Sequence, residues 1–235
     1  MLRLAGSRVL VVGANTGQDC RYFKDWGAAE VHGLDVLEYT GADYQAPGVT
    51  YHIESAEAMS LASDYFDLVY CFATMEHIPQ IDRAFREMAR VTRPGGVIYC
   101  IAAPLWNSRF GHHKGNLFPE PWIHLRMTRD EIVDFSHKNG IDAPDGIETH
   151  VDYMLDPANM NQVPARRYVE VCKSLPRMKI LRNDLECEPP EAVPPDVLSE
   201  LASRGYAGEE LRAVTHVYIG KKRSIKGRMF GWLSR

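Results

Sequence analysis

The chain has 235 residues, of which 45% are hydrophobic and 25% are charged, and its formal net charge is −4 at pH 7. These values are typical of one α/β domain with an insertion, or of two small domains. The slightly acidic balance argues against a nucleic-acid partner bound through a broad basic surface, and no apolar run approaches the roughly 20 residues of a membrane-spanning helix.

The N-terminal segment and the cysteines favour a cytoplasmic protein. The first residues lack the long apolar stretch and the small-residue cleavage site of a signal peptide. The chain has five cysteines, an odd number, and no Cys-x-x-Cys pair. We therefore expect neither a disulfide framework nor a cysteine zinc site.

Strands and helices alternate in the first hundred residues. Short apolar runs predict strands at 9–12, 30–36, 49–55, 66–73 and 97–103. Apolar residues at helical spacing predict helices at 20–26 and 82–92, and the run Arg-Pro-Gly-Gly at 93–96 ends the second of these. Such alternation implies a parallel sheet that binds its ligand at the carboxyl ends of the strands.

The turn after the first strand suits a nucleotide-type cofactor. It reads Gly-Ala-Asn-Thr-Gly at 13–17, and a glycine there allows a sharp turn and a close approach of the ligand. The following helix offers free N–H groups and the positive end of its dipole. Asp35 ends the second strand about 20 residues further on, where a carboxylate can accept hydrogen bonds from ribose hydroxyls. Either feature alone also suits an ordinary turn, but the two together predict a cofactor site.

Besides Asp35, four segments form a recognisable series along residues 8–103: VLVVGANTG (9–17), ESAEAMSL (54–61), FDLVYCFATMEHI (66–78) and RVTRPGG (90–96). In this order they resemble the segments of class I S-adenosylmethionine-dependent methyltransferases of the small-molecule type. The resemblance implies a Rossmann-like, doubly wound, seven-stranded mixed sheet with an inserted substrate lid. It also implies S-adenosylmethionine as the cofactor.

The resemblance assigns roles to residues that follow the strands. It places Gly13, Ala14, Asn15 and Gly17 under the methionine part, Asp35 at the ribose, Val36, Ala56 and Glu57 at the adenine, and Cys71 and Phe72 beside the sulfonium. Three residues depart from the family pattern. Val11 and Ser55 stand where the family has acidic residues, and Asn15 stands where it has a glycine. These departures leave open the alternative that the chain is a binding module that has lost catalysis. Asp19 is a candidate to replace the acidic charge that the family has at the position of Val11.

A second alternative is another Rossmann enzyme that uses a nucleotide sugar or a nicotinamide. Such an enzyme would show a Gly-x-Gly-x-x-Gly loop and a Tyr-Lys or similar redox pair, and neither is evident in this sequence.

Residues 104–175 are expected to form the lid. Helices are expected at 128–140, capped by Thr128, and at 164–175, followed by strands at 178–184 and 213–222. The expected divisions are a cofactor-binding half (1–103), the lid (104–175), the last strands (176–222) and a basic amphipathic tail (223–235).

Histidines and tryptophans of the lid are the candidate acceptor-site residues. Histidine titrates near neutrality, so His113, and next His77 after the fourth strand, are candidate bases for an acceptor hydroxyl. The candidate substrate contacts are Trp106, His112, Trp122 and His124. A metal held by His112, His113 and His124 is an alternative, but adjacent histidines do not easily face one ion, so we expect no metal.

The expected activity is O-methylation of a sugar, a glycolipid or another small molecule. The sequence GHH followed by PWIHL is similar to methyltransferases that act on saccharides, which suggests saccharide biosynthesis. In the tail, basic residues alternate with aromatic ones, which suits either peripheral contact with an anionic membrane or an ordinary solvated terminus.

Overall fold

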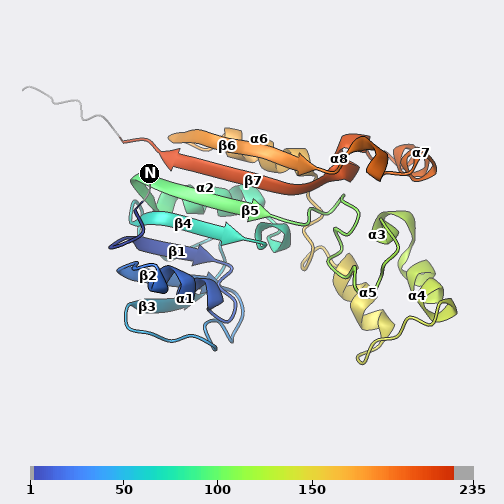
Figure 1. Cartoon of the computed structure of the whole chain (residues 1–235), viewed down its shortest axis with the longest axis horizontal. Helices are drawn as coiled ribbons and strands as arrows, with labels where there is room; N and C mark the ends of the chain where they lie inside the picture. The colour runs from blue at the N-terminus through green and yellow to red at the C-terminus, as the bar shows by residue number, and fades with distance from the viewer. Residues whose placement is uncertain (1–2, 225–235) are drawn as a thin grey trace, which may run out of the picture.

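The computed structural model describes residues 3–224, whose centre is a seven-stranded sheet with the order β3-β2-β1-β4-β5-β7-β6 (Figure 1). The strands are β1 (Arg8–Val12), β2 (Glu30–Asp35), β3 (Val49–Ile53), β4 (Phe66–Phe72), β5 (Thr92–Ala102), β6 (Met178–Cys187) and β7 (Ala213–Lys222). β7 is antiparallel to β5 and β6, whereas β1 to β5 pair in parallel. The Rossmann-like, doubly wound mixed sheet is therefore confirmed.

Helices cover both faces of this sheet. They are α1 (Gln18–Asp25) on one face, and α2 (Ile81–Val91) and α6 (Ala165–Lys173) on the other. Side chains of β1 alternate between the faces, because Val9 and Val11 belong to the cluster of α1 and Leu10 and Val12 to the cluster of α2. Burial on both faces explains why β1 is a continuous apolar run.

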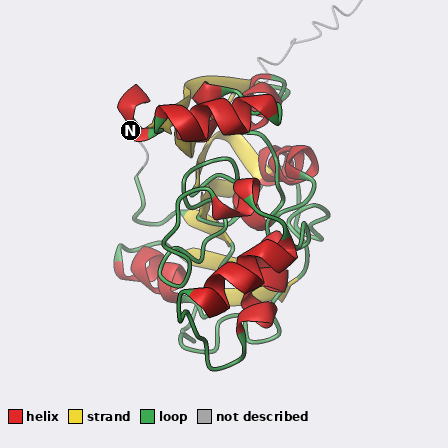
Figure 2. Ribbon diagram, turned by 90° about the vertical axis from the view of Figure 1, so that its right-hand side faces the viewer, coloured by secondary structure: helices red, strands yellow, loops and turns green. Residues whose placement is uncertain are grey.

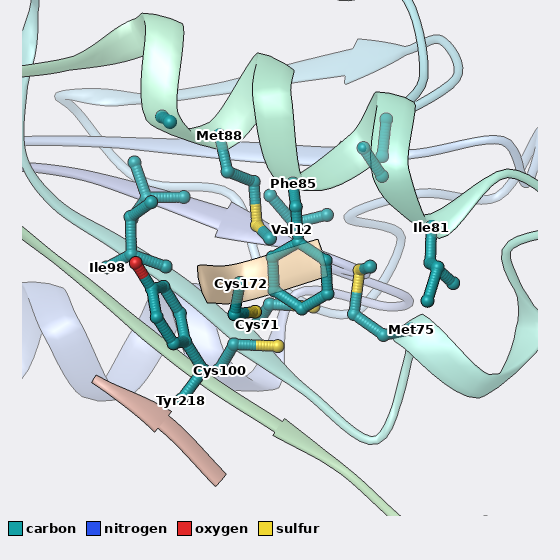
Figure 3. Close-up of a cluster of buried hydrophobic side chains, with 14 of the residues drawn as sticks. Val12, Cys71, Met75, Ile81, Phe85, Met88, Ile98, Cys100, Cys172 and Tyr218 are labelled. Carbon is teal, nitrogen blue, oxygen red and sulfur yellow. The ribbon is translucent and has the colours of Figure 1, made fainter. Parts of the chain in front are cut away.

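The core between the sheet and the helices α2 and α6 contains three cysteines (Figure 3). Cys71, Cys100 and Cys172 are fully or almost fully buried, and they lie in one cluster with Phe85 and Met88. They act there as small hydrophobic residues, as expected for buried thiols outside a redox or metal motif.

The remaining helices lie beyond the carboxyl ends of the parallel strands (Figures 1 and 2). They are α3 (Ile123–Arg126), α4 (Arg129–Lys138), α5 (Ile147–Leu155), α7 (Pro195–Ser203) and α8 (Gly208–Arg212), with short 3-10 turns η1 (Met75–His77) and η2 (Pro190–Ala192). The side chain of Thr128 caps α4 through a capping box with Glu131. Among residues 3–224, no helix is both long and apolar enough to cross a bilayer.

The lid differs from the expected range at its C-terminal boundary. Helix α6 packs on the sheet, because Tyr168 and Cys172 belong to the main core. Within residues 104–163, which we call the lid, Trp122 and Leu125 instead share a separate cluster with Val197 of α7 and Leu211 of α8. The sequence analysis missed this because α6 follows the lid without a change in composition.

Two local differences concern β5 and His77. Strand β5 starts at Thr92, because Phe66 pairs with Thr92 before the register shifts to Leu68 and Val97. His77 lies in η1 and precedes the first residue of α2, Ile81.

The basic tail belongs mostly to residues 225–235, which lie outside the described residues.

Candidate cofactor and acceptor site

A pocket of about 840 Å³ lies at the carboxyl ends of β1, β2 and β4. Its walls include most of the residues that the sequence assigns to a cofactor: Gly13, Ala14, Asn15, Asp35, Val36, Ala56, Glu57 and Phe72. This is the edge at which the chain order of the sheet reverses, where parallel α/β sheets bind ligands.

The turn after β1 requires a glycine at its start. Gly13 has a positive φ of 80°, and a Cβ atom there would overlap the side chain of Thr74. The N–H groups of Gly13 and Ala14 both donate to the carbonyl oxygen of Leu34, at 2.8 and 3.1 Å. These bonds hold the turn against the end of β2, and the opposite side of the turn faces the pocket.

Asp35 connects the ends of β1 and β2. Its carboxylate accepts hydrogen bonds from the backbone N–H of Asn15 at 2.9 Å and from that of Val36 at 2.8 Å. A carboxylate has about four acceptor positions, so these bonds leave capacity for hydroxyl donors of a ligand.

The wall of the pocket beyond Asp35 combines one fixed carboxylate with apolar surface. Glu57 accepts a hydrogen bond from the N–H of Gln80 at 2.8 Å, which ties the segment after β3 to the start of α2. Val36 is 65% exposed and Phe72 is 48% exposed, although both side chains are apolar. A flat apolar ligand would cover them, which favours binding.

Asp19 lies in the first turn of α1 and lines the same pocket. Partial burial raises the pKa of its carboxyl group above the usual value. Asp19 is thus placed where it can face a cationic group of a ligand, as the sequence suggests.

Two predicted cofactor residues do not line the pocket. Gly17 precedes α1 with a φ of 101°, and a Cβ atom there would overlap the hydroxyl of Tyr51, so this glycine serves close packing. Cys71 is 0% exposed and points into the core of Figure 3. Side chains alternate along a strand, so Phe72 reaches the pocket and its neighbour Cys71 does not.

The structure adds pocket residues that the sequence analysis missed. Some follow the strands of the sheet, among them Thr16, Tyr39 and Thr74. Three others come from the lid: Tyr153 of α5, and Ala158 and Asn159 after it. Tyr153 is 42% exposed, an unusual position for an aromatic side chain on an amphipathic helix. No local motif marks these lid residues, because only the folding of the lid over the sheet brings them to the pocket.

His77 and His113 meet across the boundary between sheet and lid. Their rings contact edge to face, with centroids 4.9 Å apart. His77 lines the cofactor pocket, whereas His113 lines a second pocket of about 380 Å³ together with Pro104, Phe110 and Asn116. The two candidate bases are therefore brought together between the two pockets.

Backbone carbonyls fix the tautomers of both rings. The Nδ1 of His77 lies 2.7 Å from the oxygen of Asn159, and the Nε2 of His113 lies 2.8 Å from the oxygen of Pro104. A carbonyl oxygen only accepts, so each of these nitrogens carries the hydrogen and the opposite nitrogen of a neutral ring has a lone pair. Burial lowers the pKa of His113 to about 4, so this ring is neutral at pH 7.

Glu76 lies beside the histidine pair and is almost fully buried. The residue is 3% exposed, and within the described part of the chain neither carboxylate oxygen has a hydrogen-bond partner of good geometry. Burial raises the pKa of Glu76 to about 8, although backbone N–H groups such as that of Ala103 oppose the rise.

The expected substrate contacts belong to the interior of the lid, which corrects the sequence analysis. Trp106, His112, Trp122 and His124 are at most 9% exposed, and none of them lines either pocket. The indole N–H of Trp122 donates to the oxygen of Leu211 at 3.3 Å, and the Nε2–H of His124 donates to that of Trp106 at 2.7 Å. A lid that extends beyond the sheet needs a core of its own, and these large side chains form it.

Comparisons with known proteins agree with the fold. Residues 10–100 match the family described as a methyltransferase domain. The chain also superimposes on an S-adenosylmethionine-dependent methyltransferase from Mesorhizobium loti with a TM-score of 0.55, at 16% identity and over 94% of both chains. At that identity the likeness shows the fold.

Two curated relatives each match only part of the chain. Methyltransferase GfsG of Streptomyces halstedii is 34% identical over 100 residues, which are 39% of this chain and 36% of the relative. A ubiquinone biosynthesis O-methyltransferase of Neisseria meningitidis is 26% identical over 143 residues, 57% of this chain and 55% of the relative. The chain thus spans about half or less of the length of these relatives. Both agree with the enzyme class that the sequence predicts.

Proposed function

We propose that the chain is an S-adenosylmethionine-dependent methyltransferase that methylates a hydroxyl oxygen of a small molecule. The observation that carries this proposal is the open pocket around Gly13 and Asp35, most of whose lining residues lie within residues 10–100, which match the methyltransferase domain.

The residues of the pocket fit the parts of S-adenosylmethionine. Asp35 offers a carboxylate for the ribose, Val36 an apolar surface for the adenine, and Asp19 a negative charge for the methionine ammonium. The exposed aromatic face of Phe72 suits the positive sulfonium. When bound, this cofactor supplies a methyl group that an acceptor oxygen takes as the carbon–sulfur bond breaks and its electron pair stays on the sulfur.

The second pocket is the proposed acceptor site. His77 lines the cofactor pocket and His113 lines the second pocket, so an acceptor bound in the second pocket with its hydroxyl turned toward the cofactor would lie near both rings. The ring nitrogen that does not donate to a backbone carbonyl can receive the hydroxyl proton. Positioning is the other contribution, since methyl transfer needs an in-line approach of oxygen to the methyl carbon.

Oxygen is proposed as the methylated atom because imidazoles suit a hydroxyl that needs a base, and because one matching relative is an O-methyltransferase. A saccharide acceptor stays a prediction. The tryptophans proposed as substrate contacts are buried, which leaves Tyr39, Phe72 and Tyr153 as exposed aromatic surfaces that line the cofactor pocket. Membrane contact also stays a prediction, because it depends on residues 225–235.

Binding of S-adenosylhomocysteine, measured by calorimetry, tests the cofactor. We expect micromolar affinity that falls strongly in Asp35→Ala and is kept in Glu38→Ala, an exposed residue that does not line the pocket. A folded protein that binds neither S-adenosylhomocysteine nor S-adenosylmethionine would contradict the proposal. Binding by itself does not demonstrate catalysis. A module that has lost catalysis would bind but would give no product 14 Da heavier, about the mass of a CH2 group, in a metabolite extract.

A further inference from the structure

We propose that Glu76, His77 and His113 bind one divalent transition-metal ion of the Zn²⁺ type between the two pockets. The sequence analysis expected no metal and considered only His112, His113 and His124 for one. The folded chain instead joins His113 of the lid with the Glu-His pair that follows β4.

The geometry of the three side chains is close to that of a metal site. One ligand atom of each residue can be chosen so that all lie within 4.8 Å of one another. Ligand atoms around a tetrahedral Zn²⁺, each about 2.1 Å from the ion, lie about 3.4 Å apart. The cluster therefore has to contract on binding, which requires rotation of the side chains.

The hydrogen bonds of both histidines are those of metal ligands. Each ring donates one N–H to a backbone carbonyl, His77 to Asn159 and His113 to Pro104. Such a bond to the outer nitrogen fixes the ring and leaves the other nitrogen for the ion, as in most protein sites with histidine ligands. The rings approach to 4.9 Å between centroids, so the ion would lie between them.

Glu76 supplies the independent observation. Its carboxyl group is buried beside the two rings, and within residues 3–224 both oxygens are without a well-formed hydrogen bond. Leaving such a group without a partner is costly, and a cation beside it would remove that cost. His113 also has a φ of 61°, a conformation that few non-glycine residues adopt and that is common at functional sites.

The composition of the cluster indicates the type of ion. Imidazole and carboxylate ligands suit Zn²⁺, Fe²⁺ and Co²⁺ better than the oxygen-seeking Mg²⁺ or Ca²⁺. Three protein ligands leave at least one position open, as in catalytic zinc sites. This inference deepens the proposed function at the same residues: a cation there would lower the pKa of a bound hydroxyl, so direct proton uptake by the imidazoles would not be needed.

Metal binding can be tested without any methyl transfer. The full chain, prepared without a histidine tag and treated with a chelator, is titrated with Co²⁺ and followed by its visible absorption. We expect one Co²⁺ ion per chain and an absorption spectrum typical of Co²⁺ bound by nitrogen and oxygen ligands. Added Zn²⁺ should displace the Co²⁺ and abolish this spectrum. His113→Ala and the isosteric Glu76→Gln should each weaken Co²⁺ binding at least 10-fold.

Matched measurements separate this inference from the proposed function and from misfolding. His137→Ala removes an exposed histidine of α4 and should leave Co²⁺ binding unchanged. Binding of S-adenosylhomocysteine and the circular dichroism melting curve are recorded for every variant. If S-adenosylhomocysteine binds normally while the wild-type chain takes up no Co²⁺ or Zn²⁺, or while folded His113→Ala binds Co²⁺ as tightly as wild type, the metal site is wrong and the methyltransferase proposal stands.

Discussion

The carboxylate of Asp35 and the backbone N–H of Asn15 form a 2.9 Å hydrogen bond that joins the end of β2 to the turn after β1. Asn15 itself has a positive φ of 44°, so the bond holds a turn that its own backbone disfavours. Asp35 therefore has two roles in the proposed site. It shapes the turn that borders the pocket, and it offers the remaining acceptor positions to the ribose.

The substitution Asp35→Asn tests the charge of this side chain. An asparagine keeps the size of the side chain but loses the charge, and its amide nitrogen replaces one of the two oxygens that accept from the backbone N–H groups of Asn15 and Val36. Because hydrogen bonds to a charged group contribute about 1.5–3 kcal/mol, we expect S-adenosylhomocysteine to bind about 10- to 100-fold more weakly. Calorimetry measures the affinity, and Glu38→Gln is the control. An unchanged affinity in Asp35→Asn would mean that the carboxylate is not a ligand of the ribose.

Gly17 shows why a glycine in a cofactor motif need not contact the cofactor. A Cβ atom at Gly17 would overlap the hydroxyl of Tyr51, and the φ of 101° is unfavourable for alanine. We expect Gly17→Ala to lower the free energy of unfolding by about 1–3 kcal/mol. Gly140→Ala is the control, because Gly140 also has a positive φ, 65°, but no atom near its Cβ position. Equal losses in urea denaturation would show that packing against Tyr51 contributes nothing.

Trp122 tests whether the large lid residues serve stability or the acceptor. Its side chain is 1% exposed and lies in the cluster that joins α3 to α7 and α8. Trp122→Ala should reduce the free energy of unfolding by about 3–5 kcal/mol, the usual cost of deleting a large buried side chain. If the variant is folded at low temperature, its affinity for S-adenosylhomocysteine should stay within about twofold of wild type. Trp26→Ala, which removes an exposed indole, should change stability by at most about 0.5 kcal/mol. A stable Trp122→Ala protein would contradict the packing role.

The cofactor half was predictable from the sequence because local patterns determine it. Burial on both faces makes β1 a continuous apolar run, and the reversal of strand order places the turn at Gly13 and the carboxylate of Asp35 at one edge. The residues at 213–222 form β7 at the expected positions. For these elements, the spacing of apolar residues along the chain predicts which faces of each strand or helix are buried.

The lid was less predictable because its contacts are long-range. His113 touches His77, and Trp122 bonds to Leu211, through pairings that no periodicity encodes. Aromatic and histidine side chains can either contact a ligand or fill a small core, and the amino-acid composition of a segment is the same in both cases. Only the three-dimensional structure distinguishes the two roles. It shows Trp106 and His124 buried inside the lid and Tyr153 exposed at the pocket.

His216 of β7 gives the protein a specific sensitivity to acid. Its Nε2–H donates to the side-chain oxygen of Asn183 at 2.8 Å, and its Nδ1 is buried without a partner among residues 3–224. Burial lowers the pKa of His216 from 6.5 to about 4. Well above pH 6.5 the ring is neutral in both the folded and the unfolded chain, so it does not affect the pH dependence of stability there. Between pH 6.5 and 4 the unfolded chain takes up a proton that the folded chain does not, so stability falls with pH. The contribution of His216 to this loss is about 2 kcal/mol between pH 7 and pH 5.

His216→Gln can keep the bond to Asn183 but does not titrate, so urea denaturation at the two pH values should show a correspondingly smaller loss of stability. The exposed His137→Gln should behave as wild type, and a loss in His216→Gln equal to that of wild type would show that this ring is not the cause.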